Sequence, residues 1–425
     1  MDAEGPARDR AVFFVLFAAV FAVYAVGACR TIYVGDSGEL VTAVAVLGIP
    51  HPSGYPLYVL LGKLFCLLVP ISSYAFRMSL FSAFFGALAS SLLFLLARRA
   101  RLSRPASVLS GLLLAFVPSF WAEANVQRVY TLNAFFVVVA TFFAVKWHQE
   151  RRDGFLLAAF FACGLGATNH TYMAVYAFGL GLFVLLSDLE AIRALGRAEG
   201  WIQWGKRFAA FFAGLLPYLY LPVRSRMNPP LDWGNPETLE AFWRVVSRHD
   251  FWDRRWIRGP VDLVPITADW LKGLFTESLG IGLLLAALGV VVAFRRKSPT
   301  LLFLLAMAGN LLSMALHGSR SDIFIWHRYY IPSFVMLALL AGYGADALIR
   351  RLPPAAGWGV LLVPAALLVT GWRPHDRSRY RIGEAFSEEV LRETPPGGHL
   401  IASDDNILFV LMYLHLAEGR RPDVD

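Results

Sequence analysis

Charged residues are scarce in this chain. Asp, Glu, Lys and Arg together make up 16% of its 425 residues, whereas soluble globular proteins average about 25%. Hydrophobic residues reach 57%, against about 45–50% in soluble proteins, and a water-facing globule cannot bury such a surplus. This composition excludes disordered and fibrous proteins and predicts a polytopic membrane protein.

Cysteine is rare too, and familiar motifs of soluble enzymes are missing. The three cysteines, Cys29, Cys66 and Cys163, lie in apolar runs, which excludes a disulfide framework and predicts packing roles. No HExxH, P-loop, GxGxxG or CxxC motif occurs, so the sequence does not support soluble nucleotide chemistry. The formal net charge of +8 is assigned to membrane topology and not to nucleic acid, because basic residues bracket the apolar runs.

About eleven apolar runs come near the roughly 20 residues that a spanning helix needs. The first is expected to be a retained anchor and not a signal peptide, because no small-residue cleavage site follows it. Basic clusters at Arg98, Arg151, Arg295 and Arg350 are placed inside, which puts the N-terminus inside and the C-terminus outside. The predicted spans are 11–29, 76–97, 106–121, 131–147, a hairpin of two short helices in 155–187, 208–222, 279–294, 301–316, 331–348 and 357–372.

Three further segments complete the predicted membrane domain, residues 1–372. The run 55–70 is predicted to lie at the outer interface within a first outer loop, 30–76, because a crossing there would move the next basic cluster outside. A long second outer loop is expected at 223–278, and an amphipathic cytoplasmic stretch at 188–207.

The composition turns polar in the last segment, residues 373–425. Residues 398–403 predict a strand and 406–418 predict a helix with apolar residues at helical spacing. We interpret them as the start of an outer α/β domain that the chain does not complete.

Two carboxylates follow the first span in the sequence GDSGEL. Asp36 and Glu39 are three residues apart, so both lie on one face if the segment is helical. One interpretation is a catalytic pair at the outer membrane face. The other is a helix N-cap with its capping-box partner, a pairing that Ser37 also permits.

Other polar residues gather at the outer ends of the predicted spans. They include His51 in the Pro-rich turn HPSGYP, which alternatively only stiffens the entry to an interfacial helix, and His170, which alternatively is a packed histidine. Isolated arginines at such ends are often snorkelling anchors. The candidate residues for binding a donor phosphate or substrate are His51, Tyr55, Arg77, His170, Arg224, His327 and Arg328.

The long outer loop is rich in tryptophan. Five of the twelve tryptophans lie there, and such density is typical of a loop that rests on lipid or of a platform for a sugar. These residues are Trp233, Trp243, Trp252, Trp256 and Trp270.

Six sequence blocks resemble the membrane glycosyltransferases of the C-type fold. The blocks are GDSGELVTAVAVLGIPHPSGYPLYVLLGKLF from Gly35, RMSLFSAFFGAL from Arg77, VYTLNAFF from Val129, GLGATNHTY from Gly164, LPYLYLPVRSRMNPPLDWGNP from Leu216 and SDIFIWHRYYIP from Ser321. The most similar branch comprises bacterial relatives of the animal transmembrane protein that O-mannosylates plexin-type receptors. The resemblance implies an all-α C-type fold in a bacterial inner membrane, with the active site outside.

The resemblance also implies a reaction. A sugar, mannose or another hexose, moves with inversion from a polyprenyl-phosphate donor to a hydroxyl acceptor, which is Ser or Thr of an exported protein. Asp36 best matches the general base of the family, and Glu39 is second. No cofactor is implied; a divalent metal, which two converging carboxylates permit, is not favoured. One departure concerns Arg128, which stands where the family usually has Glu, while Glu123 lies five residues earlier.

Two alternatives stay open. The acceptor is a lipid or glycan if the chain acts like the aminoarabinose transferase of lipid A. A transporter or flippase of lipid-linked sugars belongs to a different class, but such proteins place ionisable residues near the membrane midplane on repeated halves. Here the carboxylates are interfacial and no repeat is visible.

Overall fold

The computed structural model describes residues 4–187, 192–193, 195–254, 259–317 and 327–424. These ranges contain helices and no named strand, and a single parallel bridge joins Ile49 to Asp232. The predicted all-α class is therefore confirmed.

The first half of the chain contains the helices α1 (Glu4–Gly27), α2 (Ser37–Val46), α3 (Pro56–Leu68), α4 (Tyr74–Arg99), α5 (Arg104–Phe116), α6 (Pro118–Ala124), α7 (Tyr130–Glu150), α8 (Asp153–Ala167), α9 (Tyr172–Ser187), α11 (Ala198–Gly214), η1 (Leu216–Leu219) and α12 (Tyr220–Ser225). The second half contains α13 (Leu239–Val246), η2 (His249–Arg254), η3 (Pro260–Asp262), α14 (Leu263–Glu277), α15 (Ile281–Arg295), α16 (Thr300–His317), η4 (His327–Tyr330), α18 (Ile331–Ile349), η5 (Ala356–Leu361), α19 (Leu362–His375), α20 (Ile382–Glu393), α21 (Asp405–Met412) and η6 (Tyr413–Ala417).

Several helices have the length and apolarity of membrane spans. Five qualify alone in the described ranges, and up to eight do if each of three bent helix pairs counts as one span. The pairs are α5 with α6, bent by 65°, α11 with the helix at Leu216–Ser225, bent by 44°, and Pro260–Glu277 with α15, bent by 107°. The chain is a multi-pass membrane protein, while the total of eleven spans stays a prediction.

The predicted hairpin in 155–187 is confirmed, because α8 and α9 flank a break at residues 168–171. The helix predicted at 55–70 forms as α3, which exposes Leu60, Leu64, Leu67 and Leu68, while its place at the membrane interface stays a prediction. The expected separation of 188–207 from the next span is wrong, since α11 runs unbroken from Ala198 to Gly214; residues 188–191 and 194 lie outside the described part.

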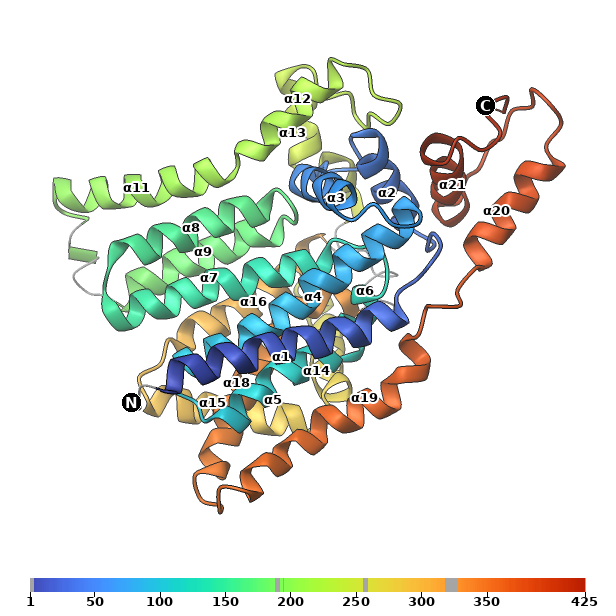
Figure 1. Ribbon diagram of the computed structural model, residues 1–425. Helices are drawn as coiled ribbons and strands as arrows, with labels where there is room; N and C mark the ends of the chain where they lie inside the picture. The colour runs from blue at the N-terminus through green and yellow to red at the C-terminus, as the bar shows by residue number, and fades with distance from the viewer. Residues whose placement is uncertain (1–3, 188–191, 194, 255–258, 318–326, 425) are drawn as a thin grey trace.

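The four basic clusters meet at one end of the helix bundle, with the N-terminus beside them (Figure 1). Ion pairs connect the helices at this end. Asp9 pairs with Arg98 and Arg104, Glu150 pairs with Arg99, and the buried Asp346 pairs with Arg296 and Arg350. The predicted placement of these clusters on a common side fits this arrangement.

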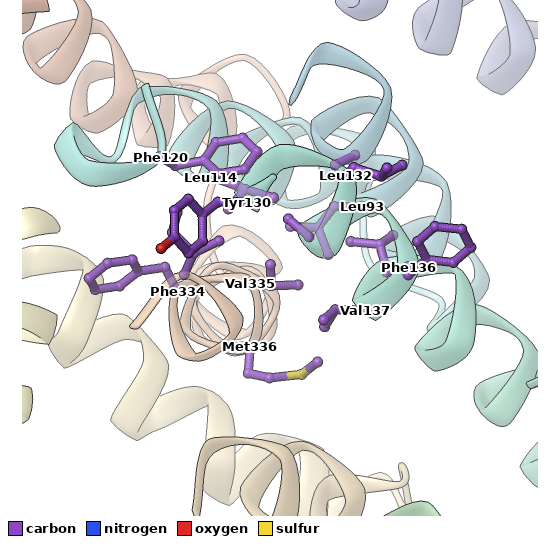
Figure 2. Close-up of a cluster of buried hydrophobic side chains, with 14 of the residues drawn as sticks. Leu93, Leu114, Phe120, Tyr130, Leu132, Phe136, Val137, Phe334, Val335 and Met336 are labelled. Atoms are coloured by element: carbon purple, nitrogen blue, oxygen red, sulfur yellow. The ribbon is translucent and has the colours of Figure 1, made fainter. Parts of the chain in front are cut away.

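The opposite end carries α2, α3, α12, α13 and α21 (Figure 1). The hydrophobic core extends up to this end: Figure 2 shows Tyr130, at the start of α7, beside Phe334 of α18 and Leu114 of α5. On the flanks of the bundle apolar side chains face outward, and Phe178 and Val369 are 76% and 77% exposed. Such a flank suits lipid.

The described part of 373–425 differs from the prediction. The helix expected at 406–418 forms as α21 and η6, but the strand expected at 398–403 is wrong, because these residues carry no regular structure and pair with no neighbouring strand. Instead α21 packs on α2 at close range: a Cβ at Gly38 would lie 2.1 Å from the carbonyl oxygen of Phe409.

Candidate active site

Two cavities meet at the end of the bundle that carries α2 and α21. The larger has a volume of about 630 Å³ and lies among the loop after α12, the helix ends of α7, α9 and α16, and the turn around His51. The smaller, about 270 Å³, lies between the start of α2 and α6. Asp36, Arg328 and Asp405 line both cavities, so these three side chains stand where the two spaces meet.

Asp36 is presented by the turn before α2. Gly35 makes this turn with φ +68°, and a Cβ there would lie 2.8 Å from Nη2 of Arg128. Asp36 occupies the N-cap position of α2, yet its side chain makes no capping hydrogen bond. Its carboxylate instead lies 3.1 Å from Nη1 of Arg128, whose Nη2 donates to the carbonyl of Val34 at 2.9 Å.

The charges around Asp36 decide its protonation. Burial would raise the pKa of Asp36, but the positive charges of Arg128, His51 and Arg328 outweigh burial and lower the pKa to about 2. The side chain remains 35% exposed. Asp36 is therefore an ionised, accessible carboxylate at neutral pH.

Glu39 holds His51 in place. Its fully buried carboxylate accepts a hydrogen bond from the backbone N–H of His51 at 2.7 Å, and lies 2.5 Å from Nδ1 of the same residue. The capping-box interpretation of GDSGEL does not describe the structure, because Glu39 bonds to His51 and Asp36 pairs with Arg128. Glu39 lines neither cavity and acts through His51.

The other side of His51 faces the larger cavity. Its Nε2 lies 3.0 Å from the hydroxyl of Tyr55, to which Arg248 donates at 3.2 Å. Burial would lower the pKa of His51, but the Tyr55 hydroxyl and the carboxylates of Glu39 and Asp36 raise it to about 10. At neutral pH the cavity wall therefore carries an imidazolium and a guanidinium close together.

Arg328 supplies a further cation at the junction. Its guanidinium lies over the rings of Tyr130 and Tyr329, at 5.5 Å and 5.3 Å from their centroids, and 4.0 Å from the buried carboxylate of Glu123. The aromatic rings and the carboxylate together fix a permanently charged group beside Asp36.

The bundle side of the larger cavity is polar but neutral. Asn310 and Ser313 of α16 line it, as does Asn133 of α7, which is 1% exposed. Among the described residues, neither the oxygen nor the nitrogen of the Asn133 amide finds a hydrogen-bond partner. His170 also lines this cavity, and burial together with the charge of Arg248 lowers its pKa to about 3, so its ring is neutral.

Of the three remaining predicted site residues, one lines a cavity. His327 lines the smaller cavity, where Nδ1 faces Glu277 at 3.2 Å and Nε2 faces Asp269 at 3.6 Å. Arg77 donates to the carbonyls of Cys66 and Ser72, and Arg224 to those at the C-terminal end of α2. Neither arginine lines the two cavities.

Some lining residues had no marked signal in the sequence. Arg248 lies in the long loop with equal numbers of acidic and basic residues, and Asn133 lies within an apolar run. Asp405 follows Asp404 before an apolar helix, a common helix-start pattern.

Of the tryptophans predicted to form a platform, Trp233 lines the larger cavity, while Trp256 lies outside the described residues. Within those residues no group of three His, Cys, Asp or Glu side chains is arranged to hold a metal, and metal independence stays a prediction.

Comparison with known proteins finds similarity to membrane glycosyltransferases. Residues 36–192 match the model of the protein O-mannosyl-transferase TMEM260 N-terminal domain. The protein O-mannosyl-transferase TMEM260 of Mus musculus is 28% identical over 99% of this chain and 63% of its own length. The corresponding protein of Dictyostelium discoideum is 24% identical over 98% of this chain and 56% of its own length. The chain thus spans less than two thirds of these curated relatives.

Solved structures share the fold. ArnT from Cupriavidus metallidurans bound to undecaprenyl phosphate aligns with a TM-score of 0.61 at 16% identity, covering 97% of this chain and 88% of ArnT. The oligosaccharyltransferase of Archaeoglobus fulgidus aligns with a TM-score of 0.51 at 14% identity, covering 90% and 58%. The resemblance seen in the sequence blocks is confirmed: the chain is a relative of the TMEM260 protein O-mannosyl-transferases and has the C-type fold of membrane glycosyltransferases.

Proposed function

We propose that this protein is an inverting glycosyltransferase. It moves mannose or another hexose from a polyprenyl-phosphate donor to a Ser or Thr hydroxyl of an exported protein, at the outer face of the inner membrane. The observation that carries the proposal is the ionised carboxylate of Asp36 at the meeting point of two cavities. The names of the curated relatives support it, as does the undecaprenyl phosphate bound by ArnT.

The larger cavity suits the donor. Its volume of about 630 Å³ fits a hexose with its phosphate, and His51, Arg248 and Arg328 supply positive charge. The neutral polar groups of Asn133 and Asn310 suit sugar hydroxyls. The smaller cavity, on the other side of Asp36, then receives the acceptor hydroxyl.

Asp36 acts as the general base in a single displacement. The acceptor oxygen forms a bond to the anomeric carbon, the bond from this carbon to the phosphate oxygen breaks, and the hydroxyl proton passes to Asp36. Because attack and departure occur on opposite faces, the anomeric centre inverts. A carboxylate with a low pKa suffices, since the attacking hydroxyl becomes strongly acidic as its oxygen bonds to an oxocarbenium-like carbon.

The cations of the larger cavity stabilise the leaving group. The polyprenyl phosphate gains a negative charge as the sugar leaves, and fixed cations lower the energy of this transition state without rearranging. Arg328, held by two aromatic rings and Glu123, and His51, held by Glu39, are positioned before the donor arrives.

Substitution of Asp36 tests the proposal. Asp36→Asn keeps the size of the side chain but cannot accept a proton, so turnover with a polyprenyl-phosphate sugar and a Ser/Thr peptide should fall by about 10²–10⁴. Glu39→Gln should cause a smaller loss, since Glu39 acts through His51. The matched control is Asp404→Asn, which removes the same charge from an N-cap outside both cavities and should leave turnover unchanged. Full activity of the Asp36 variant would remove the catalytic assignment.

The fate of the labelled sugar separates the acceptor classes. Membranes supplied with radiolabelled polyprenyl-phosphate mannose should place the label on exported protein. Label in a lipid or glycan fraction would favour the aminoarabinose-transferase type of reaction. Labelled mannose that crosses the membrane while still attached to its polyprenyl phosphate would indicate a transporter.

A further inference from the structure

A third cavity lies at the opposite end of the bundle from the candidate active site, between the ends of α4, α7 and α18 and the start of α16. Its volume is about 580 Å³. We call it the basic pocket and define it by Arg101, His148, Arg296, Lys297, Ser298 and Arg350. The proposed glycosyl transfer uses none of these residues.

The charge of the basic pocket is one-sided. Its described lining residues include four permanent cations and no carboxylate. The fully buried Asp346 pairs with Arg296 and Arg350, each at 2.7 Å. Two of the four cations therefore share one carboxylate. Arg101 and Lys297 form no ion pair with any residue in the described part of the chain.

Backbone geometry holds these cations around the cavity. The α4–α5 turn is tied to α18, because Arg350 donates to the carbonyl of Arg101 at 3.2 Å. The α15–α16 turn is tied to α7, because a ring nitrogen of His148 lies 2.9 Å from the carbonyl of Lys297. In addition, α16 begins directly after Ser298 and Pro299, which places the positive end of an 18-residue helix at the pocket.

A snorkelling or topogenic role does not by itself explain this arrangement. Basic residues that only set orientation need not surround a common hollow, and neighbouring cations repel one another when no anion lies between them. Arg295 and Arg351 are topogenic in the same way but do not line the pocket. Convergence of four cations and a helix start on one cavity is typical of sites for phosphate groups.

We propose that the basic pocket binds a phosphate group, carried by an anionic lipid headgroup or free in solution. The site is separate from the donor site, because it lies at the other end of the helices and shares no lining residue with the two outer cavities (Figure 1). Occupation should link α4, α7, α16 and α18 and so raise the thermal stability of the bundle.

The test uses the full chain in uncharged detergent. We expect the melting temperature to rise on addition of dioctanoyl phosphatidylglycerol, of inorganic phosphate, or of both, but not of dioctanoyl phosphatidylcholine. A rise with the lipid alone identifies a headgroup site, and a rise with inorganic phosphate alone identifies a site for the free anion. No rise with either probe would overturn the proposal.

Matched double variants separate the pocket from the general surface charge. R101Q/K297Q removes two pocket cations that form no ion pair, so the fold should persist and the apparent affinity should fall about thirtyfold. R295Q/R351Q removes the same charge from adjacent positions outside the pocket and should change the affinity by less than about threefold. An equal loss of affinity in the two double variants would mean that the pocket residues only set the membrane orientation. Because this readout is binding and not turnover, it is independent of the proposed glycosyl transfer.

Discussion

At the scale of single residues, Arg128 sets the charge of the candidate base. It is the strongest of the cationic influences that lower the pKa of Asp36 to about 2. In Arg128→Met this charge is gone, while burial still favours the neutral acid and His51 and Arg328 still favour the carboxylate, so the pKa of Asp36 should rise from about 2 towards its ordinary value of about 3.9. Asp36 then becomes protonated, and turnover should fall, as the pH drops through this new pKa.

The pH profile of turnover between pH 4 and 9 checks this prediction. In the unsubstituted protein turnover should not fall towards the acid end of this range, whereas in Arg128→Met it should begin to fall as the pH approaches about 4. Arg128→Lys keeps the positive charge and should stay closer to the flat profile. Identical profiles for all three proteins would mean that Arg128 does not control Asp36.

Asn133 gives a second residue-scale prediction. Its buried amide has no hydrogen-bond partner in the described part of the chain but lines the larger cavity, so removal of the amide should relieve an unsatisfied polar group. Asn133→Leu is therefore expected to raise the melting temperature slightly. If the amide binds a sugar hydroxyl, the KM for the donor should rise about tenfold to a hundredfold.

Thr131 is the matched control for Asn133. It lies on the same turn of α7 and is buried, and its hydroxyl also has no hydrogen-bond partner within the ranges that the structure describes, but it lines neither cavity. Thr131→Val should leave the donor KM unchanged. A KM for Asn133→Leu that equals the control value would exclude a role in donor binding.

The sequence identified residue types at the site but not their partners. Asp36, His51 and His170 stand out because ionisable groups are rare between apolar runs. Their partners are distant or featureless: Arg128 lies on another loop, and Arg248 sits in a loop of balanced charge. Pairing of this kind depends on helix packing, which a single sequence does not reveal.

At the scale of elements, the contact between α2 and α21 holds the C-terminal segment over the site. Asp405 and Phe409 of α21 line the larger cavity, and Gly38 of α2 allows the approach of the two helices. In Gly38→Ala the new Cβ would meet a backbone carbonyl at 2.1 Å, so α21 must move. We expect at least a tenfold loss of turnover and faster proteolysis within residues 394–404.

Gly205→Ala provides the control for this substitution. Gly205 lies within α11 and has open space around it, so the change should alter neither turnover nor proteolysis. Undisturbed proteolysis and turnover in Gly38→Ala would show that the close approach has no role in docking α21.

Helices were predicted well where charged residues flank an apolar run. The helices of the hairpin α8–α9 and the helix α3 followed from run length and from the positive-inside tendency. The strand at 398–403 was wrong, because a short apolar run indicates burial but does not provide a pairing partner. The helix α14, which leads through a bend of 107° into α15, was assigned to a loop, because Asp269, Lys272 and Glu277 interrupt its apolar run.

At the scale of the whole molecule, charge and apolarity are distributed along one axis. The basic clusters gather at one end, apolar side chains cover the flanks, and the candidate active site lies at the other end. Such a distribution suits a protein held across a membrane with its basic end in the cytoplasm. The donor phosphate and the acceptor would then be met on the outer side.

Cysteine labelling in intact cells tests this orientation. The three natural cysteines are buried, so a single introduced cysteine reports its own position. A membrane-impermeant maleimide should label Glu240→Cys in the outer loop and Glu388→Cys in α20, because both side chains are on the side of the candidate site. Arg101→Cys, within the basic end, should react only after permeabilisation. The reversed pattern would place the basic end outside, against the positive-inside tendency, and would make an exported acceptor incompatible with the location of Asp36.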